Sequence, residues 1–167
     1  MSRFKSQNFY QAILSKLKHK RYDVIQFEGV FVSLYLQKLK PFTVAPCVLR
    51  THNIEYKLWN DRIAFMPWGL KRWYLKLQTK RLQKFEMQQW LKSDAIIPIS
   101  PEDQEFINVA LNSPKPVKYI PVGLNIQTPE LHANRDLLFV GSMDWKPNYL
   151  GLKWFFKHVW PSLLENR

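Results

Sequence analysis

The chain has 167 residues, of which 46% are apolar and 15% aromatic, enough for one globular domain or for one domain and a piece of another. Its 25 Lys and Arg against 13 Asp and Glu give a net charge of +12, which favours polyanionic partners, although solubility alone would also explain it. Its one cysteine, Cys47, excludes an intrachain disulfide and, within an apolar run, predicts an inert buried thiol in a reducing compartment. No stretch approaches the roughly 20 apolar residues of a membrane span, and the N-terminus lacks the apolar core of a signal peptide.

Apolar residues recur along the chain with the periods of helices and strands in alternation. Ser100, followed by Pro101 and two acids, is a strong helix start, with Ser100 as a cap rather than a nucleophile. The predicted helices cover residues 9–20, 30–39, a short segment ending near 60, 70–92, 101–111 and 147–164, and the predicted strands cover 22–27, 46–50, 94–99, 117–121 and 137–141. Continuous apolar strands that alternate with helices predict an α/β fold, with a parallel Rossmann-like sheet and helices on both faces.

Ligands of such sheets bind beyond the carboxyl ends of the strands. The loop after the apolar run 137–140 leads from Gly141 into a helix opened by Pro147. Backbone N–H groups and the dipole at a helix start favour an anion, so Gly141, Ser142 and Lys146 are the candidate phosphate-binding residues. An ordinary strand-to-helix turn, in which Gly141 supplies the backbone conformation, explains the same pattern.

His52 follows the predicted strand 46–50 at its carboxyl end and is the candidate catalytic residue. A neutral imidazole there can exchange a hydrogen bond with a ligand hydroxyl, and a nearby carboxylate can fix its tautomer. Arg50, Asn53 and Glu55 are the candidate acceptor or phosphate contacts beside it. The alternatives are a loop histidine bonded to backbone, and an arginine that pairs with Glu55 or with another acid.

Five segments in order resemble a known family. They are RTHNIE at 50–55, Glu86 on the long helix, SDAIIPISPED at 93–103, YIPVGLNI at 119–126 and LLFVGSMDWKPNYLGLKWFFKHVWPSL at 137–163. Over roughly residues 22–164 the chain resembles the middle of a family-four (group-one) retaining glycosyltransferase of the GT-B fold. The order and spacing of the segments carry the resemblance.

The resemblance implies two Rossmann-like domains that face each other across a cleft. Residues 1–121 would be a partial acceptor-side domain, 122–135 an interdomain connector, and 136–167 the first strand and helix of a truncated donor-binding domain. His52 would line the cleft, and the loop from Gly141 to Lys146 would lie beside the donor diphosphate. The implied activity is transfer of a hexose, with retention, from a nucleotide-diphosphate sugar to a glycan or a lipid-linked acceptor, with no further cofactor and no metal.

Several features of the family are missing from this sequence. Its Gly-rich loop near the start and its paired donor-binding glutamates are absent, and Ser142 and Pro147 stand where the family often carries Arg and Lys, with Lys146 adjacent to the second position. We therefore expect an incomplete GT-B fold, either a gene fragment or one part of a split protein. We expect this chain alone to transfer no sugar.

In the predicted helix 70–92, six cations between Lys71 and Lys84 have no acid between them. Arg72, Lys76, Lys80 and Lys84 follow an i, i+4 ladder, in which like charges destabilise a helix by roughly 0.2–0.5 kcal/mol per pair. Packing or an anionic partner must offset this cost. Together with the aromatic residues at the start of the helix, the ladder suits a membrane surface rich in anionic lipid, and a solvated face is the alternative.

These patterns leave a second function open, a non-enzymatic basic module that docks on nucleic acid or on anionic membrane. Nucleic acid is not the expected partner, because the sequence contains no recognised nucleic-acid-binding motif. Scattered histidines and a single cysteine predict no metal site. The expected location is cytoplasmic, with peripheral attachment to the inner face of the cytoplasmic membrane if the basic helix docks there.

Overall fold

The structure is a computed structural model that describes residues 4–123 and 137–165. The chain divides into two compact units, Met1–Leu124 and Asn125–Arg167. Most of the predicted connector 122–135, including His132, lies outside the described residues.

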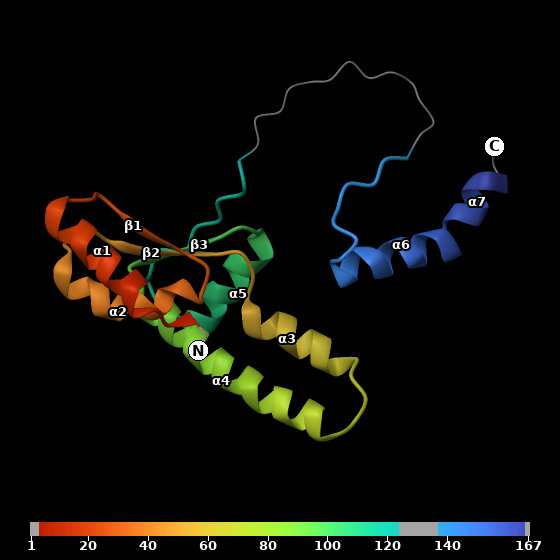
Figure 1. Cartoon of the computed structure of the whole chain (residues 1–167), viewed down its shortest axis with the longest axis horizontal. Coiled ribbons are helices and arrows are strands. Elements are labelled where there is room, and N and C mark those ends of the chain that lie inside the picture. The colour runs from red at the N-terminus through yellow and green to blue at the C-terminus, as the bar shows by residue number, and fades with distance from the viewer. Residues whose placement is uncertain (1–3, 124–136, 166–167) are drawn as a thin grey trace, which may run out of the picture. The chain divides into compact units, whose positions relative to one another are not determined.

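The first unit alternates helices and strands, as the sequence predicts (Figure 1). Helix 70–92 and helix 101–111 begin and end where they were predicted, and Ser100 caps the latter by accepting a hydrogen bond from the N–H of Asp103 at 3.1 Å. The elements are α1 (Gln7–His19), β1 (Ile25–Glu28), the 3-10 helix η2 (Val32–Tyr35), α2 (Leu36–Leu39), the 3-10 helix η3 (Lys40–Phe42), β2 (Cys47–Thr51), α3 (Glu55–Ala64), α4 (Leu70–Lys92), β3 (Ala95–Pro98) and α5 (Pro101–Leu111).

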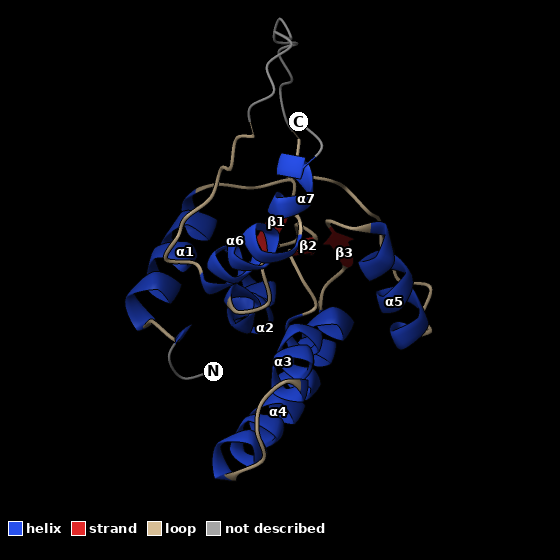
Figure 2. Cartoon of the chain, turned by 90° about the vertical axis from the view of Figure 1, so that its right-hand side faces the viewer, coloured by secondary structure: helices blue, strands red, loops and turns tan. Residues whose placement is uncertain are grey.

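The described residues of this unit form one parallel sheet in the order β1-β2-β3, which confirms the predicted α/β class. Its strands are seen nearly end-on in Figure 2, with α2, α3 and α4 of the same unit below them. Phe27, Leu49 and Ile96 are register partners on one face and belong to the core. The opposite face is open at its β1 edge, where Gln26 and Glu28 are exposed, whereas Val48 of β2 on that face is buried.

The core is built from long apolar side chains of the sheet and of the helices that pack on it. Trp90 of α4 is fully buried and lies beside Tyr56 of α3, with ring centroids 6.3 Å apart. Cys47 is a free, fully buried thiol, as the sequence predicts, and burial raises its pKa above the ordinary value. The thiolate that would make it reactive is therefore disfavoured.

The predicted fourth strand, 117–121, is only partly formed. Its backbone runs beside β3, where the N–H groups of Lys118 and Ile120 donate to carbonyl groups of Ile96 and Pro98 at 3.0 and 3.1 Å. The N–H of Tyr119 instead donates to the side chain of Gln104. Prolines at both ends lack the N–H groups that would extend the ladder, so the segment adds an irregular edge to the sheet.

The second unit is described from residue 137 to residue 165. Its helices are α6 (Lys146–His158) and α7 (Trp160–Glu165), so the predicted helix 147–164 is interrupted near Val159. The strand predicted at 137–141 is not observed: residues 137–140 pair with no strand among the described residues, and Leu138 is 89% exposed. A strand needs a neighbour to satisfy its backbone groups, and an apolar pattern alone does not supply one.

Helices α3 and α4 lie side by side as a hairpin whose loop end projects away from the sheet (Figures 1 and 2). The buried residues of α4 begin only at Thr79, so its first two turns lie outside the core. Among the described residues, no helix is both long enough and apolar enough to cross a membrane.

Candidate functional site

The strand ends bring an acid and a histidine together at the carboxyl edge of the sheet. Glu28 is the last residue of β1, and His52 comes directly after β2. The Nε2 atom of His52 lies 2.8 Å from Oε2 of Glu28, and both side chains are about half exposed. The candidate catalytic histidine is thus held by a specific side chain rather than by backbone.

The local backbone explains how Glu28 reaches this position. Gly29 turns the chain after β1 with φ of +83°, a conformation that other residues adopt only with strain. Its N–H donates to the carbonyl oxygen of Arg50 at 2.8 Å, which extends the pairing of β1 with β2 by one bond. Because Glu28 and Arg50 are register partners, their side chains leave the sheet on the same face.

The surroundings of Glu28 favour its ionised form. Partial burial alone would raise the pKa of Glu28, but hydrogen bonds from His52 and Gln26 and the positive charge of Arg50 outweigh burial. The pKa of Glu28 therefore lies below its ordinary value. Glu28 is a carboxylate at neutral pH.

An ionised carboxylate only accepts hydrogen bonds, so it selects the form of His52 that carries a proton on Nε2. In neutral His52 the other ring nitrogen, Nδ1, is then an acceptor. Such a nitrogen can take a proton from, or accept a hydrogen bond from, a ligand hydroxyl. The geometry therefore gives His52 the properties of an oriented base.

A second carboxylate fixes the segment that follows His52. Glu86 of α4 is fully buried, and its two oxygens accept the backbone N–H groups of Glu55 and Tyr56, each at 3.1 Å. These N–H groups belong to the first turn of α3, where Ile54 as N-cap offers no side-chain acceptor. Glu86 thus caps the N-terminus of α3 although it belongs to α4, and it fixes the start of α3 just after His52.

Burial is the strongest influence on Glu86 and on Glu55. It raises the pKa of Glu86 to about 7, because the two backbone hydrogen bonds only partly compensate for the loss of water, and the charges of Glu55 and Asp103 act in the same direction as burial. Burial also raises the pKa of Glu55, against the charges of Arg62 and His52. The acids around His52 therefore differ in state, with Glu28 ionised and Glu86 close to its midpoint at neutral pH.

Arg50 and Asn53, the remaining candidates in this segment, differ in their surroundings. Nη2 of Arg50 is 3.5 Å from the carbonyl oxygen of Pro121, a weak contact, and its charge acts on Glu28. Asn53 is exposed in the turn between β2 and α3.

In the candidate phosphate loop of the second unit, the Ser142 carbonyl accepts hydrogen bonds from neighbouring residues. Nδ2 of Asn148 donates to the carbonyl oxygen of Ser142 at 3.0 Å, and the N–H of Trp145 donates to the same oxygen at 3.3 Å. A Cβ atom on Gly141 would lie 2.8 Å from Asn148 Nδ2 and 2.8 Å from Phe139 Cζ. A side chain at position 141 would therefore force Asn148 or Phe139 to move.

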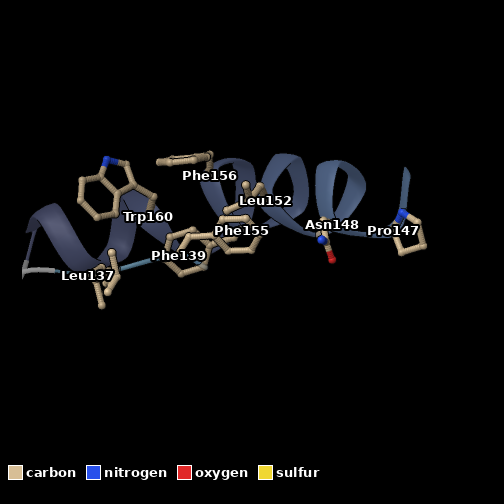
Figure 3. A pocket seen from close by; sticks show the side chains of 10 residues that line it. Leu137, Phe139, Pro147, Asn148, Leu152, Phe155, Phe156 and Trp160 are labelled. Carbon is tan, nitrogen blue, oxygen red and sulfur yellow. The ribbon is translucent and has the colours of Figure 1, made fainter. Parts of the chain in front are cut away.

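A hollow in the same unit is lined almost entirely by apolar side chains. Figure 3 shows Phe139, Phe155, Phe156 and Trp160 among the side chains that line it. The side chain of Asn148 is its polar group. Such a surface suits contact with other apolar side chains better than contact with a diphosphate.

The four predicted membrane-surface residues lie along α4 and are not equivalent. The guanidinium of Arg72 donates to the carbonyl oxygen of Met66 at 2.8 Å and lies 4.4 Å from the centre of the Trp68 ring. Lys76 lies 5.2 Å from the same ring. Lys80 and Lys84 are exposed. Arg72 therefore contributes to the hairpin loop itself, and the cations further along α4 face solvent.

Comparison of the chain with protein-family models, with curated proteins and with solved structures finds no match. The arrangement of side chains is therefore the basis for assigning a function.

The sequence places Glu28 and Gly29 in one of the strand-end loops where ligands of such a sheet bind, but it does not predict the contact of Glu28 with His52. The available signal was its place at the end of an apolar segment, next to a glycine that turns the chain, because the ends of parallel strands converge on one edge. Glu86 is one of the segments on which the resemblance rests, but the sequence does not predict its hydrogen bonds to the start of α3.

Proposed function

We propose that this chain is part of a retaining glycosyltransferase that moves a hexose from a nucleotide-diphosphate sugar to a glycan or a lipid-linked acceptor. The observation that carries the proposal is the contact between His52 and Glu28 at the carboxyl edge of a parallel sheet. It supports the resemblance because a ligand of such a sheet binds at that edge, and an oriented imidazole suits a sugar hydroxyl.

In this proposal each residue has a separate role. His52 contacts a hydroxyl of the bound sugar through Nδ1, and Glu28 is a positioning residue that holds the ring through Nε2. Glu86 fixes the start of α3. Lys146 and backbone N–H groups at the start of α6 that are not used inside the loop are the candidate contacts of the donor diphosphate.

The test follows the histidine signals by NMR. The chain is labelled with ¹⁵N-histidine and titrated with a panel of nucleotide-diphosphate sugars, free sugars and lipid-linked sugars. We expect saturable shifts of the His52 ring signals with at least one class of ligand, and no shift of His19, which is exposed on α1 and serves as an internal control. Unchanged His52 signals across the panel, or equal movement of His19, would contradict the proposal.

The same proposal predicts that these 167 residues alone transfer no sugar, because the family's paired donor-binding glutamates are absent from the sequence. Release of nucleotide diphosphate and formation of product are measured with each donor and acceptor. Transfer by the purified chain that is abolished by His52→Ala would show that the missing contacts are not needed.

The second function, a basic docking module without catalysis, is favoured by a different observation. The first turns of α4 project from the core with exposed cations and aromatic side chains. Docking that persists unchanged in a His52→Ala variant, together with no response of His52 to any sugar, would favour that function.

A further inference from the structure

The exposed end of the α3–α4 hairpin combines large apolar side chains with a concentration of positive charge. We call residues 65–77 the hairpin tip. Phe65 is 91% exposed, Trp68 84% and Leu70 88%. Side chains of this size are rarely left in water together on a monomeric protein, and a group of them marks an interaction surface.

The outward face of α4 continues this surface. Trp73 and Leu77 are four residues apart, and Lys80 and Lys84 follow at spacings of three and four, so the four side chains share one helix face. Trp73 is 66% exposed, and the buried positions of α4 lie on the other side of the helix. The face therefore changes from aromatic and aliphatic at the tip to cationic one to three turns further along.

The charge of this region is strongly one-sided. Between residues 56 and 85 there is one acid, Asp61. The cations in the same stretch are Lys57, Arg62, Lys71, Arg72, Lys76, Lys80, Arg81 and Lys84. A surface of this charge is complementary to an anionic partner, and its aromatic tip requires that the partner also offers an apolar or interfacial environment.

We propose that the hairpin tip docks on the surface of a bilayer rich in anionic lipid, with its aromatic side chains at headgroup depth and the cations of α4 on the lipid phosphates. Tryptophan and tyrosine favour the membrane interface, and Trp68, Trp73 and Tyr74 gather here. From Trp73 to Lys84 the helix rises about 16 Å, a length that carries the cations across the headgroup layer if the helix lies inclined to the surface. This inference does not depend on the proposed sugar transfer; it names the partner and the contact residues of the docking that is described above as the second function.

The contacts inside the hairpin loop prepare the tip for this role. Arg72 and Lys76 lie over the Trp68 ring, and Arg72 also bonds the Met66 carbonyl, so the loop has a defined conformation. The cations that remain for lipid are at exposed positions 71, 80, 81 and 84. A preformed loop binds with less loss of conformational entropy than a disordered one.

The test uses the whole chain with two kinds of vesicle, pure phosphatidylcholine and phosphatidylcholine that contains about 40 mol% phosphatidylglycerol, an anionic lipid. Binding is measured by flotation. We expect binding to the anionic vesicles only, weakened roughly 100-fold by Lys80→Gln/Arg81→Gln/Lys84→Gln, since each cation near the surface contributes about fivefold. The matched control, Lys16→Gln/Lys18→Gln/Lys20→Gln, has the same net charge and alters exposed residues at the end of α1, so it should bind almost normally.

The apolar part of the proposal is tested in the same way. Phe65→Ser/Leu70→Ser/Trp73→Ser should abolish binding, whereas Val24→Ser/Val44→Ser/Val109→Ser, which changes exposed apolar residues outside α4, should not. Lipids with brominated chains should quench tryptophan emission, and Trp68→Phe/Trp73→Phe should remove most of the quenching while binding persists. Circular dichroism checks that each variant is folded.

Four results would overturn the proposal. The first is an equal loss of binding in the charge variant and in its control, and the second is equal binding to neutral and anionic vesicles. The third is tryptophan quenching that persists in Trp68→Phe/Trp73→Phe. The fourth is RNA binding that is stronger than vesicle binding and does not need the aromatic residues. A concentration-dependent dimer that Phe65→Ser/Leu70→Ser/Trp73→Ser abolishes, without vesicle binding, would instead assign the tip to a second copy of the chain. None of these results concerns the response of His52 to sugars, so the two proposals fail separately.

Discussion

Nε2 of His52 and Oε2 of Glu28 lie 2.8 Å apart, although 24 positions separate the two residues in the chain. The contact exists because two parallel strands end at the same edge of the sheet, one with the acid and the other just before the histidine. It converts a loop histidine into one with a defined tautomer and a defined orientation.

Glu28→Gln should leave the fold intact and release the tautomer of His52. A glutamine amide can accept a hydrogen bond from Nε2 or donate one to it, so it no longer selects the Nε2-protonated form. The measurement is the ¹⁵N chemical shifts of the two ring nitrogens above pH 8, where the mixture of tautomers is read directly. Gln26→Ala, which removes the other side-chain partner of Glu28, should change the shifts much less.

Ser100→Ala should destabilise the first unit by about 1 kcal/mol. The hydroxyl of Ser100 accepts the N–H of Asp103 at 3.1 Å, and alanine leaves that N–H without its side-chain acceptor. Urea unfolding measures the change in the free energy of unfolding. Ser15→Ala, at an exposed position inside α1, should be neutral or slightly stabilising because alanine is the better helix former. Equal effects of the two substitutions would contradict the cap.

The two glycines of the second unit should respond in opposite directions to alanine. Gly141→Ala places a Cβ atom 2.8 Å from Asn148 Nδ2, so the bond from Asn148 to the Ser142 carbonyl must break or move. Gly151 lies inside α6 with no atom near its added Cβ, and Gly151→Ala should favour the helix by roughly 0.5–1 kcal/mol. NMR signals of the Asn148 side-chain amide report the first change, and helical circular dichroism reports the second.

The parts of the fold that sequence predicted are those with strong local signals. Helix 70–92 lies between Gly69 and Ser93, and helix 101–111 has its cap and its proline at the first position, so both matched the structure. Segment 30–39 was predicted as one helix but is divided between 3-10 and α geometry. There the hydroxyl of Ser33 donates to the Val30 carbonyl at 2.6 Å, which competes with regular helical bonding.

The rest depended on tertiary structure that no local pattern encodes. The apolar run 137–140 has the composition of a strand, but strand formation requires a paired neighbour, and the described residues supply none. Likewise His52 was identified from its place after a strand, whereas its partner Glu28 was defined only by the register of β1 against β2. The buried state of Glu86 also follows from packing, because α3 covers that part of α4.

Glu86→Gln should remove a pH dependence of stability between pH 5 and pH 8. The pKa of Glu86 is raised from 4.5 to about 7 in the folded chain, so the folded state holds this proton more tightly than the unfolded state does. The contribution of protonated Glu86 to stability is complete below about pH 4.5 and is lost as the pH rises through about 7. A pKa shift of this size corresponds to roughly 3 kcal/mol.

The glutamine of Glu86→Gln is neutral at every pH and keeps one acceptor for the α3 N–H groups. The free energy of unfolding is measured in urea at pH 5, 6, 7 and 8 for Glu86→Gln and for the unsubstituted chain. At pH 5 the variant should have the lower free energy of unfolding. Between pH 5 and pH 8 the difference between the two proteins should shift in favour of the variant by roughly 3 kcal/mol. Other acids titrate alike in both proteins and cancel in the difference. A difference that stays constant over the four pH values would show that Glu86 keeps an ordinary pKa and that the two hydrogen bonds to α3, rather than burial, control its charge.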